Sequence, residues 1–309
     1  ISNGPFTLRS YEEFDCIEVE KNPLYWESHK TRLDGIQMYM VSEPTEQAMF
    51  DNGLLHWSGS PITSIPTEAL PSLLKKHELS TLPALGTQYI SCNVLQPSLS
   101  NPSIRQALSY AMNRQAYIDH VLQGKQVAAL GFLPPSIAVA NAPFFKDNDS
   151  KRAQELLLNL KIPPLTLSYI AEERNAKLAQ TLQQQWKNAL GLDIQLRALE
   201  QKHFLETVKK GDYDLAISSW IGDFADPVNF LELFLYADSP LNKCNWENKK
   251  YQTLLKKAQL SENNEERSQY FLEAETLLMQ EMPILPVNFY TFKFSIRQKS
   301  SKVIYNIKN

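Results

Sequence analysis

Glycine is scarce in this sequence. It supplies 10 of 309 residues, about 3%, where a globular protein usually has about 7%. The two glycines nearest to each other, Gly53 and Gly59, are six positions apart, so the chain contains neither G-x-G-x-x-G nor G-x-x-x-x-G-K-[ST]. Both phosphate-binding loops need clustered glycines, because a Cβ would keep the backbone away from the phosphate. Dinucleotide and P-loop nucleotide cofactors are therefore not expected.

Cysteine is also scarce, and clustered histidine is missing. The three cysteines, Cys16, Cys92 and Cys244, are far apart and form no C-x-x-C, and the five histidines form no H-x-x-x-H. Zinc sites normally show such spacings, so we expect no metal site. A scaffold held by several disulfides is excluded as well, while a single bridge stays open. The nucleophile motif G-x-S-x-G is absent, which gives no support to a serine hydrolase.

The chain has no apolar run of about 18 residues, the length that would predict a membrane-spanning helix. Its formal net charge of −3 is too small to predict nucleic acid as a partner. The first residues show neither the basic nor the apolar region of a signal peptide. This leaves two interpretations, a cytoplasmic protein or a secreted chain whose start has been removed.

The most regular part of the sequence predicts strands that alternate with helices. Apolar residues repeat with a period of two in the expected strands and recur every three to four positions in the expected helices. The predicted order is strand 165–170, helix 175–190, strand 192–199, helix 204–210 and strand 213–220. Such a β-α-β-α-β pattern is typical of an α/β fold in which helices cover a sheet.

Further elements flank this unit. Asn101-Pro102 has the capping residue and the proline that commonly begin a helix, and apolar residues at helical spacing extend it to a stop at Gly124. Towards the C-terminus we expect helices 249–260 and 265–281 and a final aromatic strand 284–296.

Candidate ligand-binding residues follow the strand that ends at Trp220, because ligands of open α/β sheets bind beyond the carboxyl ends of the strands. Asp226 precedes Pro227 and is expected to cap the next helix rather than to bind a ligand. Asp223 lies in a turn between Trp220 and Phe224, where it would suit a ligand cation. From the residues alone, a solvated loop aspartate explains Asp223 equally well.

Two other patterns are consistent with function. Asp223 and Asp226 could form the pair of carboxylates that a glycosidase needs, although three residues of separation is weak support for such a pair. Trp57 follows an apolar stretch in a turn-rich sequence, and a large aromatic in such a loop indicates a binding surface.

Four stretches of the chain together resemble a known family. They are Asn3–Phe6 with Glu20–Trp26, Asn101–Leu108 with Ala111–Arg114, Trp186–Leu192, and Gly211–Asp214 followed by Trp220, Asp223 and Pro227. In this order and spacing they are similar to the oligopeptide-binding (OppA-like) proteins, the extracytoplasmic solute receptors of ABC peptide importers. The resemblance extends over nearly all of the chain.

The resemblance implies an α/β fold of the type II periplasmic-binding-protein class, with two lobes joined by a hinge. Residues 1–88 and 288–309 would form part of one lobe, and residues 89–287 would form the other, ligand-anchoring lobe. Full members of the family begin well before this pattern starts, so we expect the first lobe to be incomplete.

The resemblance also implies a function and a binding site. A peptide would lie between the lobes as an added strand, held largely by its backbone. Asp223 would pair with its α-ammonium group, and Ser219–Ile221 would offer backbone to it. The complete set of expected ligand-binding residues is Trp57, Tyr89, Lys209, Ser219, Trp220, Ile221, Gly222, Asp223, Asn288 and Tyr290. Of the positions where some members carry basic residues for the ligand carboxylate, Asn175, Val208, Lys209 and Ile217, only Lys209 is basic here.

The expected partners are a peptide ligand and the membrane permease of an ABC importer, with no nucleic acid, no metal and no cofactor. We expect a non-enzymatic monomer in the periplasm or on the cell surface, possessing a lipid anchor if an absent N-terminal segment supplies one. Two rival functions stay open: a hydrolase of the glycosidase or peptidase kind that uses Asp223 and Asp226, and a surface interaction protein that has lost transport.

Overall fold

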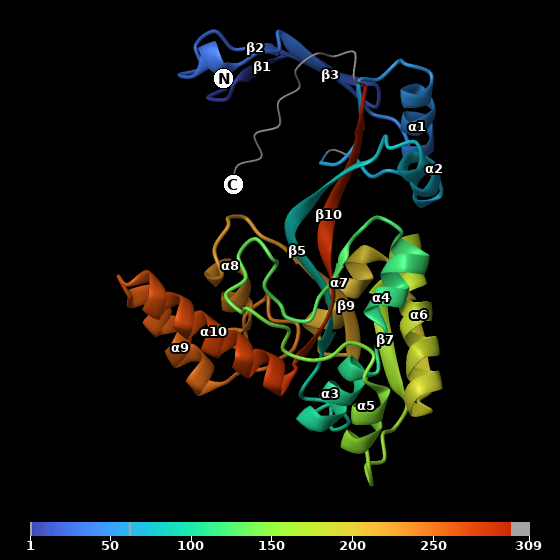
Figure 1. Ribbon diagram of the computed structural model, residues 1–309, viewed down its shortest axis with the longest axis vertical. Coiled ribbons are helices and arrows are strands. Elements are labelled where there is room, and N and C mark those ends of the chain that lie inside the picture. Colours follow the sequence, from blue (N-terminus) through green and yellow to red (C-terminus); the bar gives the residue numbers. More distant parts are fainter. Residues whose placement is uncertain (1, 62, 298–309) are drawn as a thin grey trace. The chain divides into compact units, whose positions relative to one another are not determined.

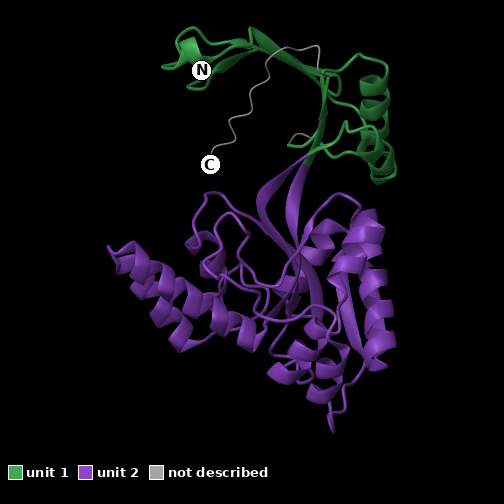
Figure 2. Cartoon of the chain, viewed as in Figure 1, with its two compact units in different colours: residues 1–80, 293–303 green, residues 81–292, 304–309 purple. Residues whose placement is uncertain are grey.

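The computed structural model describes residues 2–61 and 63–297 (Figure 1). The chain divides into two compact units (Figure 2). The described part of unit 1 comprises residues 2–80, without residue 62, and residues 293–297, while unit 2 comprises residues 81–292. The chain passes between the units within two long strands, β5 (Ser80–Cys92) and β10 (Ile284–Ile296). The lobe boundaries expected from the sequence also fall within these strands.

Unit 1 begins with an antiparallel sheet in the order β1-β2-β3, made of β1 (Phe6–Glu12), β2 (Cys16–Lys21) and β3 (Gly35–Tyr39). Residues that pair directly across the strands share a face of the sheet. The register therefore places six apolar side chains on one face, namely Leu8, Tyr11, Ile17, Val19, Ile36 and Met38. None of the residues in these three strands is fully buried.

The rest of unit 1 is small. It comprises α1 (Glu43–Asp51), β4 (Trp57–Gly59), α2 (Leu70–Lys75) and the short 3-10 helices Ser28–Lys30 and Thr67–Ala69. Strand β4 pairs with the last residues of β10. A cluster of three buried side chains, Ile65, Leu70 and Leu73, lies around α2.

Unit 2 contains the sheet that the sequence predicts. Its strands follow the order β10-β5-β9-β7-β8, with β6 (Val127–Ala128) paired to β10. The three strands of the predicted β-α-β-α-β unit are β7 (Leu165–Ile170), β8 (Ile194–Leu199) and β9 (Leu215–Ile221). Strand β7 pairs in parallel with both β8 and β9, and β5 is antiparallel to β9. The β-α-β-α-β prediction is confirmed by α6 (Glu173–Leu190) and α7 (Gln201–Lys209), which connect these strands.

The remaining helices of unit 2 are α3 (Pro102–Tyr110), α4 (Arg114–Tyr117), α5 (Ser150–Leu156), α8 (Val228–Leu231), α9 (Lys249–Leu260) and α10 (Asn264–Glu281), with a π-helix at Ile118–Leu122 and a 3-10 helix at Glu232–Phe234. The prediction of one helix from Asn101 to Gly124 was wrong. Asn113 interrupts it, because its side chain accepts a hydrogen bond from the N–H of Ala116 (2.9 Å) and so begins a second helix.

Helices pack on both sides of the strands of unit 2, with α9 and α10 on one side and α4 to α6 on the other (Figure 1). Leu178, Leu182 and Trp186 of α6 are buried in the core, as their spacing predicts, and the Trp186 indole donates to the carbonyl of Leu108 (2.8 Å). No helix within the described residues is long and apolar enough to cross a membrane. The three cysteines are free thiols.

Candidate functional site

One edge of β9 has backbone groups without a partner strand. In an antiparallel pair, hydrogen-bonded positions alternate with positions whose N–H and C=O point away from the partner. The N–H of Gly222 donates to the carbonyl of Leu85 (2.8 Å), so Gly222 is at a hydrogen-bonded position. Trp220, two residues before Gly222, lies opposite Thr87 and is at the next such position. Trp220 therefore bonds β5, whereas Ser219 and Ile221 direct their N–H and C=O groups to the opposite edge.

Strand β7 does not cover that opposite edge. It pairs with β9 only at Leu215 and Ala216, and no other strand in the described part of the chain pairs with β9 there. Ser219 and Ile221 are exposed, and 63% of the Ile221 surface is accessible. An exposed edge of this kind can take up an added strand, because its N–H and C=O groups alternate at the spacing of an extended peptide.

The turn that follows β9 presents a free carboxylate. A Cβ on Gly222 would lie 2.7 Å from Leu85 Cδ2 and 2.8 Å from Phe230 Cε2, so a larger residue would force these side chains to move. The backbone N–H of Asp223 donates to Asn229 Oδ1 (3.0 Å). The Asp223 side chain is exposed, and none of the described residues forms a hydrogen bond or an ion pair with its carboxylate. This carboxylate is available to a ligand cation.

Asp226, in contrast, is engaged within the protein. Its Oδ1 accepts hydrogen bonds from the N–H of Val228 (2.9 Å), at the start of α8, and from Arg267 Nη2 of α10 (2.8 Å). The interaction with Val228 agrees with the predicted cap, and the ion pair with Arg267 could not be foreseen from sequence spacing. A carboxylate held in this way is poorly suited to proton transfer or nucleophilic attack, which argues against Asp223 and Asp226 as a catalytic pair.

Tyr290 lies close to the side chain of Ile221. A Cβ on Gly86 would be 2.8 Å from Tyr290 Cδ2 and 3.3 Å from Ile221 Cγ1, so both side chains approach Gly86 on the same face of the sheet. The guanidinium of Arg174 lies over the Tyr290 ring, with its Cζ 4.9 Å from the ring centroid. Tyr117 is nearby, and burial raises its pKa to about 12 while the Arg174 charge acts in the opposite direction.

Arg174 was missed in the sequence, where only the neighbouring Asn175 drew attention. It is exposed, and it forms no ion pair with any carboxylate of the described residues. A cation in the first turn of a helix is disfavoured by the helix dipole, and here it lies four residues after the carboxyl end of β7. Those two features of the sequence are the signal that could have identified it.

Other expected residues lie elsewhere in unit 2. Tyr89 is only 2% exposed and packs edge-to-face against Phe132 at 5.4 Å. Asn288 is completely buried, and its Oδ1 has no partner among the described residues. Lys209 is the last residue of α7. Two residues later, the carbonyl of Gly211 accepts a hydrogen bond from Asn93 Nδ2 (3.2 Å), and Asn93 follows the end of β5 that is far from Gly86. Seven residues of strand separate the two ends, or roughly 24 Å, so the structure does not bring Lys209 to Asp223.

Trp57 belongs to unit 1 and lies in strand β4, not in a loop as the sequence predicted. Its ring stacks on Phe294 with a centroid distance of 4.9 Å and an interplanar angle of 15°. The indole N–H donates to the carbonyls of Ser60 (3.1 Å) and Gly59 (3.3 Å). These contacts explain why the side chain is half-buried.

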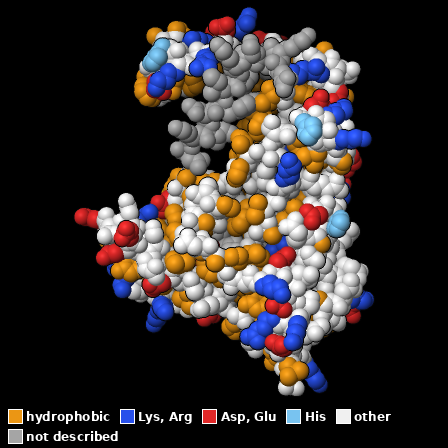
Figure 3. All heavy atoms as spheres, in the orientation of Figure 1, with side chains coloured by type: hydrophobic (Ala, Val, Ile, Leu, Met, Phe, Trp, Pro, Cys, Tyr) orange, Lys and Arg blue, Asp and Glu red, His pale blue; other side chains and the backbone are white. Residues whose placement is uncertain are grey.

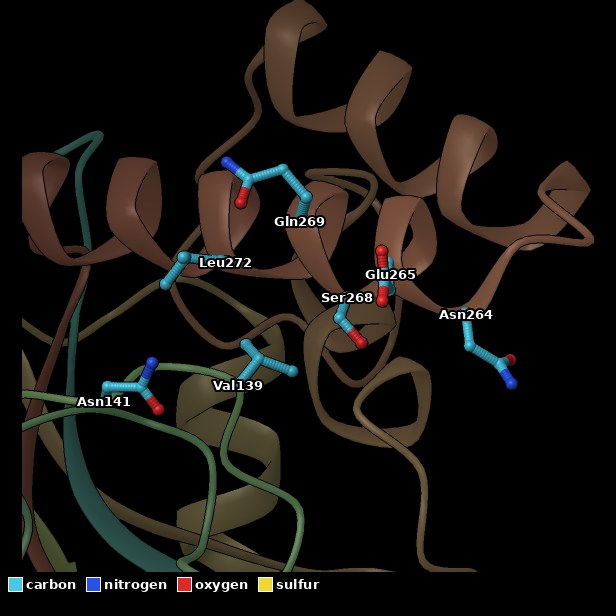
Figure 4. A pocket seen from close by; sticks show the side chains of 7 residues that line it. All are labelled: Val139, Asn141, Asn264, Glu265, Ser268, Gln269 and Leu272. Carbon is cyan, nitrogen blue, oxygen red and sulfur yellow. The ribbon is translucent and has the colours of Figure 1, made fainter.

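A surface cavity of unit 2 contains none of the expected residues. It has a volume of about 420 Å³ and lies where α10 begins (Figure 4). Its lining residues are Val139, Asn141, Asn264, Glu265, Ser268, Gln269 and Leu272. In the part of the chain that the structure describes, no group of three His, Cys, Asp or Glu residues is placed to hold a metal ion.

On the face drawn in Figure 3, hydrophobic side chains gather over the part of unit 2 where Figure 1 shows α8 and the strands β5 and β10, with few charged groups among them. The exposed apolar residues next to the β9 edge are Ile221 and Phe224, the latter 51% exposed. The geometry therefore combines an open strand edge, an apolar surround and one free carboxylate.

Comparison with known proteins identifies the family. Residues 1–241 match the family described as "Bacterial extracellular solute-binding proteins, family 5 Middle". The chain belongs to this family. It is 36% identical over 305 residues to the oligopeptide-binding protein OppA of Bacillus subtilis, a match that covers 94% of this chain and 56% of that protein. The dipeptide-binding protein DppE of the same organism is 31% identical over 305 residues, covering 94% and 55%.

The fold expected from the resemblance is confirmed by solved structures. The murein tripeptide binding protein MppA of Escherichia coli matches with a TM-score of 0.77 and 26% identity, over 96% of this chain and 60% of that one. The fold is that of the type II periplasmic-binding proteins. The chain spans about half the length of the curated relatives it matches. The family comprises solute-binding proteins of the cell exterior, not enzymes.

Proposed function

We propose that this chain belongs to a receptor that captures peptides for import. Its peptide ligand would extend the sheet of unit 2 along the free edge of β9, bonding the N–H and C=O groups of Ser219 and Ile221. The observation that carries the proposal is this unpaired edge, which ends beside the free carboxylate of Asp223. Relatives named for oligopeptide and dipeptide binding support the choice of ligand class.

Charged groups would fix the ends of the peptide. Asp223 would pair with the α-ammonium group, as the resemblance implies, and Arg174 would meet a carboxylate of the ligand from its position over Tyr290. Both pairs would be strong relative to neutral hydrogen bonds, because each joins opposite charges beside an apolar surface. Backbone bonds between these ends would accept many different side chains.

The anchor role of Asp223 is tested with matched peptides. We expect Asp223→Asn to weaken the binding of free-amine peptides about tenfold or more, equivalent to about 1.4 kcal/mol, and to change the binding of their N-acetylated forms little. Isothermal titration calorimetry measures these affinities. In the same experiment, Arg174→Gln should weaken the binding of free-acid peptides more than that of C-terminally amidated ones. Asp238→Asn removes an exposed carboxylate outside the site and is the control. Equal losses for free and acetylated peptides with Asp223→Asn would refute the anchor role.

We further propose that the receptor has no catalytic activity, acts as a monomer outside the cytoplasm and delivers peptides to the membrane permease of an ABC importer. A lipid anchor and the two lobes expected over residues 1–88 with 288–309 and residues 89–287 are part of the same proposal. Native mass spectrometry of the protein, purified without denaturation, should show a monomer that carries co-purified peptide. Turnover of peptide or sugar that Asp223→Ala abolishes would favour a hydrolase, and failure of every peptide pool to bind would favour an interaction protein.

A further inference from the structure

Asn229 joins the side chain of Trp220 to the backbone of Asp223, the residue on which the proposed anchor depends. It is the second residue of α8, and it is 4% exposed. Its Oδ1 accepts one hydrogen bond from the indole Nε1–H of Trp220 (3.2 Å) and another from the backbone N–H of Asp223 (3.0 Å). A single amide oxygen therefore fixes the last aromatic residue of β9 and the first acidic residue beyond it.

Further hydrogen bonds hold the backbone of the turn from Gly222 to Asn229. Gly222 is bonded to Leu85 of β5 through its N–H, and the N–H of Asn229 donates to the carbonyl of Asp226 (3.1 Å). Asp226 is itself held by Arg267 of α10. The turn is thus attached at both of its ends, and among the described residues Asn229 accepts the bond that orients the peptide plane of Asp223.

We propose that Asn229 is a positioning residue that determines the selectivity of this site for a free α-amine. With its N–H bonded inward to Asn229, Asp223 holds its Cα in one orientation and its carboxylate in solvent before the ligand arrives. Because the backbone of Asp223 is already fixed, binding a ligand does not have to order it, and that part of the entropy cost is avoided. This inference rests on the proposed peptide function, and it adds a residue that touches no ligand.

The test compares peptide pairs that differ only at the amino group. Asn229→Leu keeps the branched outline and the number of heavy atoms of the side chain but removes the acceptor, and we expect it to weaken free-amine peptides about tenfold while changing their N-acetylated forms by less than about twofold. Asn229→Asp keeps an acceptor in the same place and should retain the preference for a free amine. In a double-mutant cycle, Asp223→Asn should add little to the loss caused by Asn229→Leu, since both remove the same interaction.

A purely structural role of Asn229 predicts a different result. The control is Asn242, another buried amide of unit 2, which bonds Cys244, Tyr236 and Trp246 and is 6% exposed. Asn242→Leu should lower the melting temperature without changing the ratio of free-amine to acetylated affinity. If Asn229→Leu does not fold, Asn229→Ser replaces it, because the shorter side chain cannot reach both donors.

The outcomes separate this inference from the proposed function. If the wild-type protein shows no preference for a free amine, both the anchor and its positioning residue are refuted. If the wild-type protein prefers a free amine and Asn229→Leu keeps this preference, only the positioning role is refuted. The same holds if Asn229→Asp loses as much affinity for free-amine peptides as Asn229→Leu does. Loss of the preference in Asn229→Leu, with retention in Asn229→Asp and Asn242→Leu, supports it.

Discussion

Glu275 is a buried carboxylate of α10 that lies outside the proposed binding site. It is 1% exposed, and its Oε1 accepts hydrogen bonds from the N–H groups of Phe132 (2.8 Å) and Leu133 (2.9 Å). Its Oε2 is buried with no partner in the described part of the chain. Burial raises the pKa of Glu275 to about 7, although the two backbone N–H groups act in the opposite direction. Ionised Glu275 therefore carries one oxygen without compensation.

This raised pKa predicts how stability depends on pH. The folded state keeps a proton that the unfolded state releases above the ordinary pKa of 4.5, so the contribution is full below that pH and is lost as the pH rises through about 7. The free energy of unfolding should fall by up to about 3 kcal/mol across this window. Urea unfolding at about pH 5 and pH 8 measures the change.

Glu275→Gln should remove most of this pH dependence, because the amide keeps the acceptor for Phe132 and Leu133 but does not titrate. Glu273→Gln, an exposed neighbour on the same helix that accepts a bond from Gln269, is the control and should leave the wild-type profile unchanged. If the wild-type protein and Glu275→Gln lose the same stability between the two pH values, Glu275 is not the group responsible.

At the scale of residues, the sequence predicts interactions made along the chain better than those made across it. The cap formed by Asp226 could be predicted because its partner, Val228, is two residues away. Asn229 and Arg174 escaped notice because their roles depend on neighbours that only folding brings together. Alternation in a strand places Tyr89 on a face of the sheet, but it does not say that Phe132 covers this face.

At the scale of elements, Arg105 attaches the start of α3 to the end of α10. It is 2% exposed, and its guanidinium donates to the carbonyls of Leu99 (2.6 Å), Glu281 (3.1 Å) and Met282 (3.1 Å). The last carbonyls of a helix lack partners within the helix, and a cation is favourable there. Burial lowers the pKa of Arg105, but the charge is compensated by several carbonyl dipoles at once.

Replacing the guanidinium of Arg105 by another group should therefore lower the free energy of unfolding. We expect Arg105→Lys to lower the free energy of unfolding by about 3 kcal/mol, because one ammonium cannot reach all four carbonyls, that of Ser100 (3.0 Å) included, and leaves buried acceptors unpaired. Arg152→Lys, at an exposed ion pair with Glu155, should change it by less than about 0.5 kcal/mol. Urea unfolding monitored by circular dichroism compares the two, and similar effects would mean that the carbonyl contacts of Arg105 contribute little.

The sequence predicted elements well where the hydrophobic period is unbroken. The strands and helices from β7 to β9 follow from alternation and from the apolar stripe of α6, since each element can bury its own face on the next. The region after Asn101 was harder, because apolar residues keep their helical spacing through Asn113 although the chain begins a new helix there. The bond between Arg114 N–H and Asp147 (3.0 Å), 33 residues away, helps to hold that break.

At the scale of the whole molecule, the two units differ in how much apolar surface they bury. The main core cluster lies entirely in unit 2 and includes residues from β5, β7, β9 and β10. In unit 1 the described cluster has three members, and the sheet β1-β2-β3 has no residue that is fully buried. A small antiparallel sheet gains most of its stability from packing on one face. Each unit therefore has its own stability, whatever their arrangement.

Hydrogen exchange monitored by mass spectrometry tests this difference. Strands β2 and β5 each pair with a strand on both sides, so hydrogen bonding alone predicts similar protection. We expect amides of β2 to exchange at least about a hundredfold faster than those of residues 86–92 in β5, because few buried apolar contacts oppose local opening in unit 1. Leu8→Ala should barely change either rate, since Leu8 is 64% exposed, whereas Leu182→Ala should accelerate exchange throughout unit 2. Equal protection of β2 and β5 would mean that the sheet of unit 1 is stabilised by contacts beyond those of the described residues.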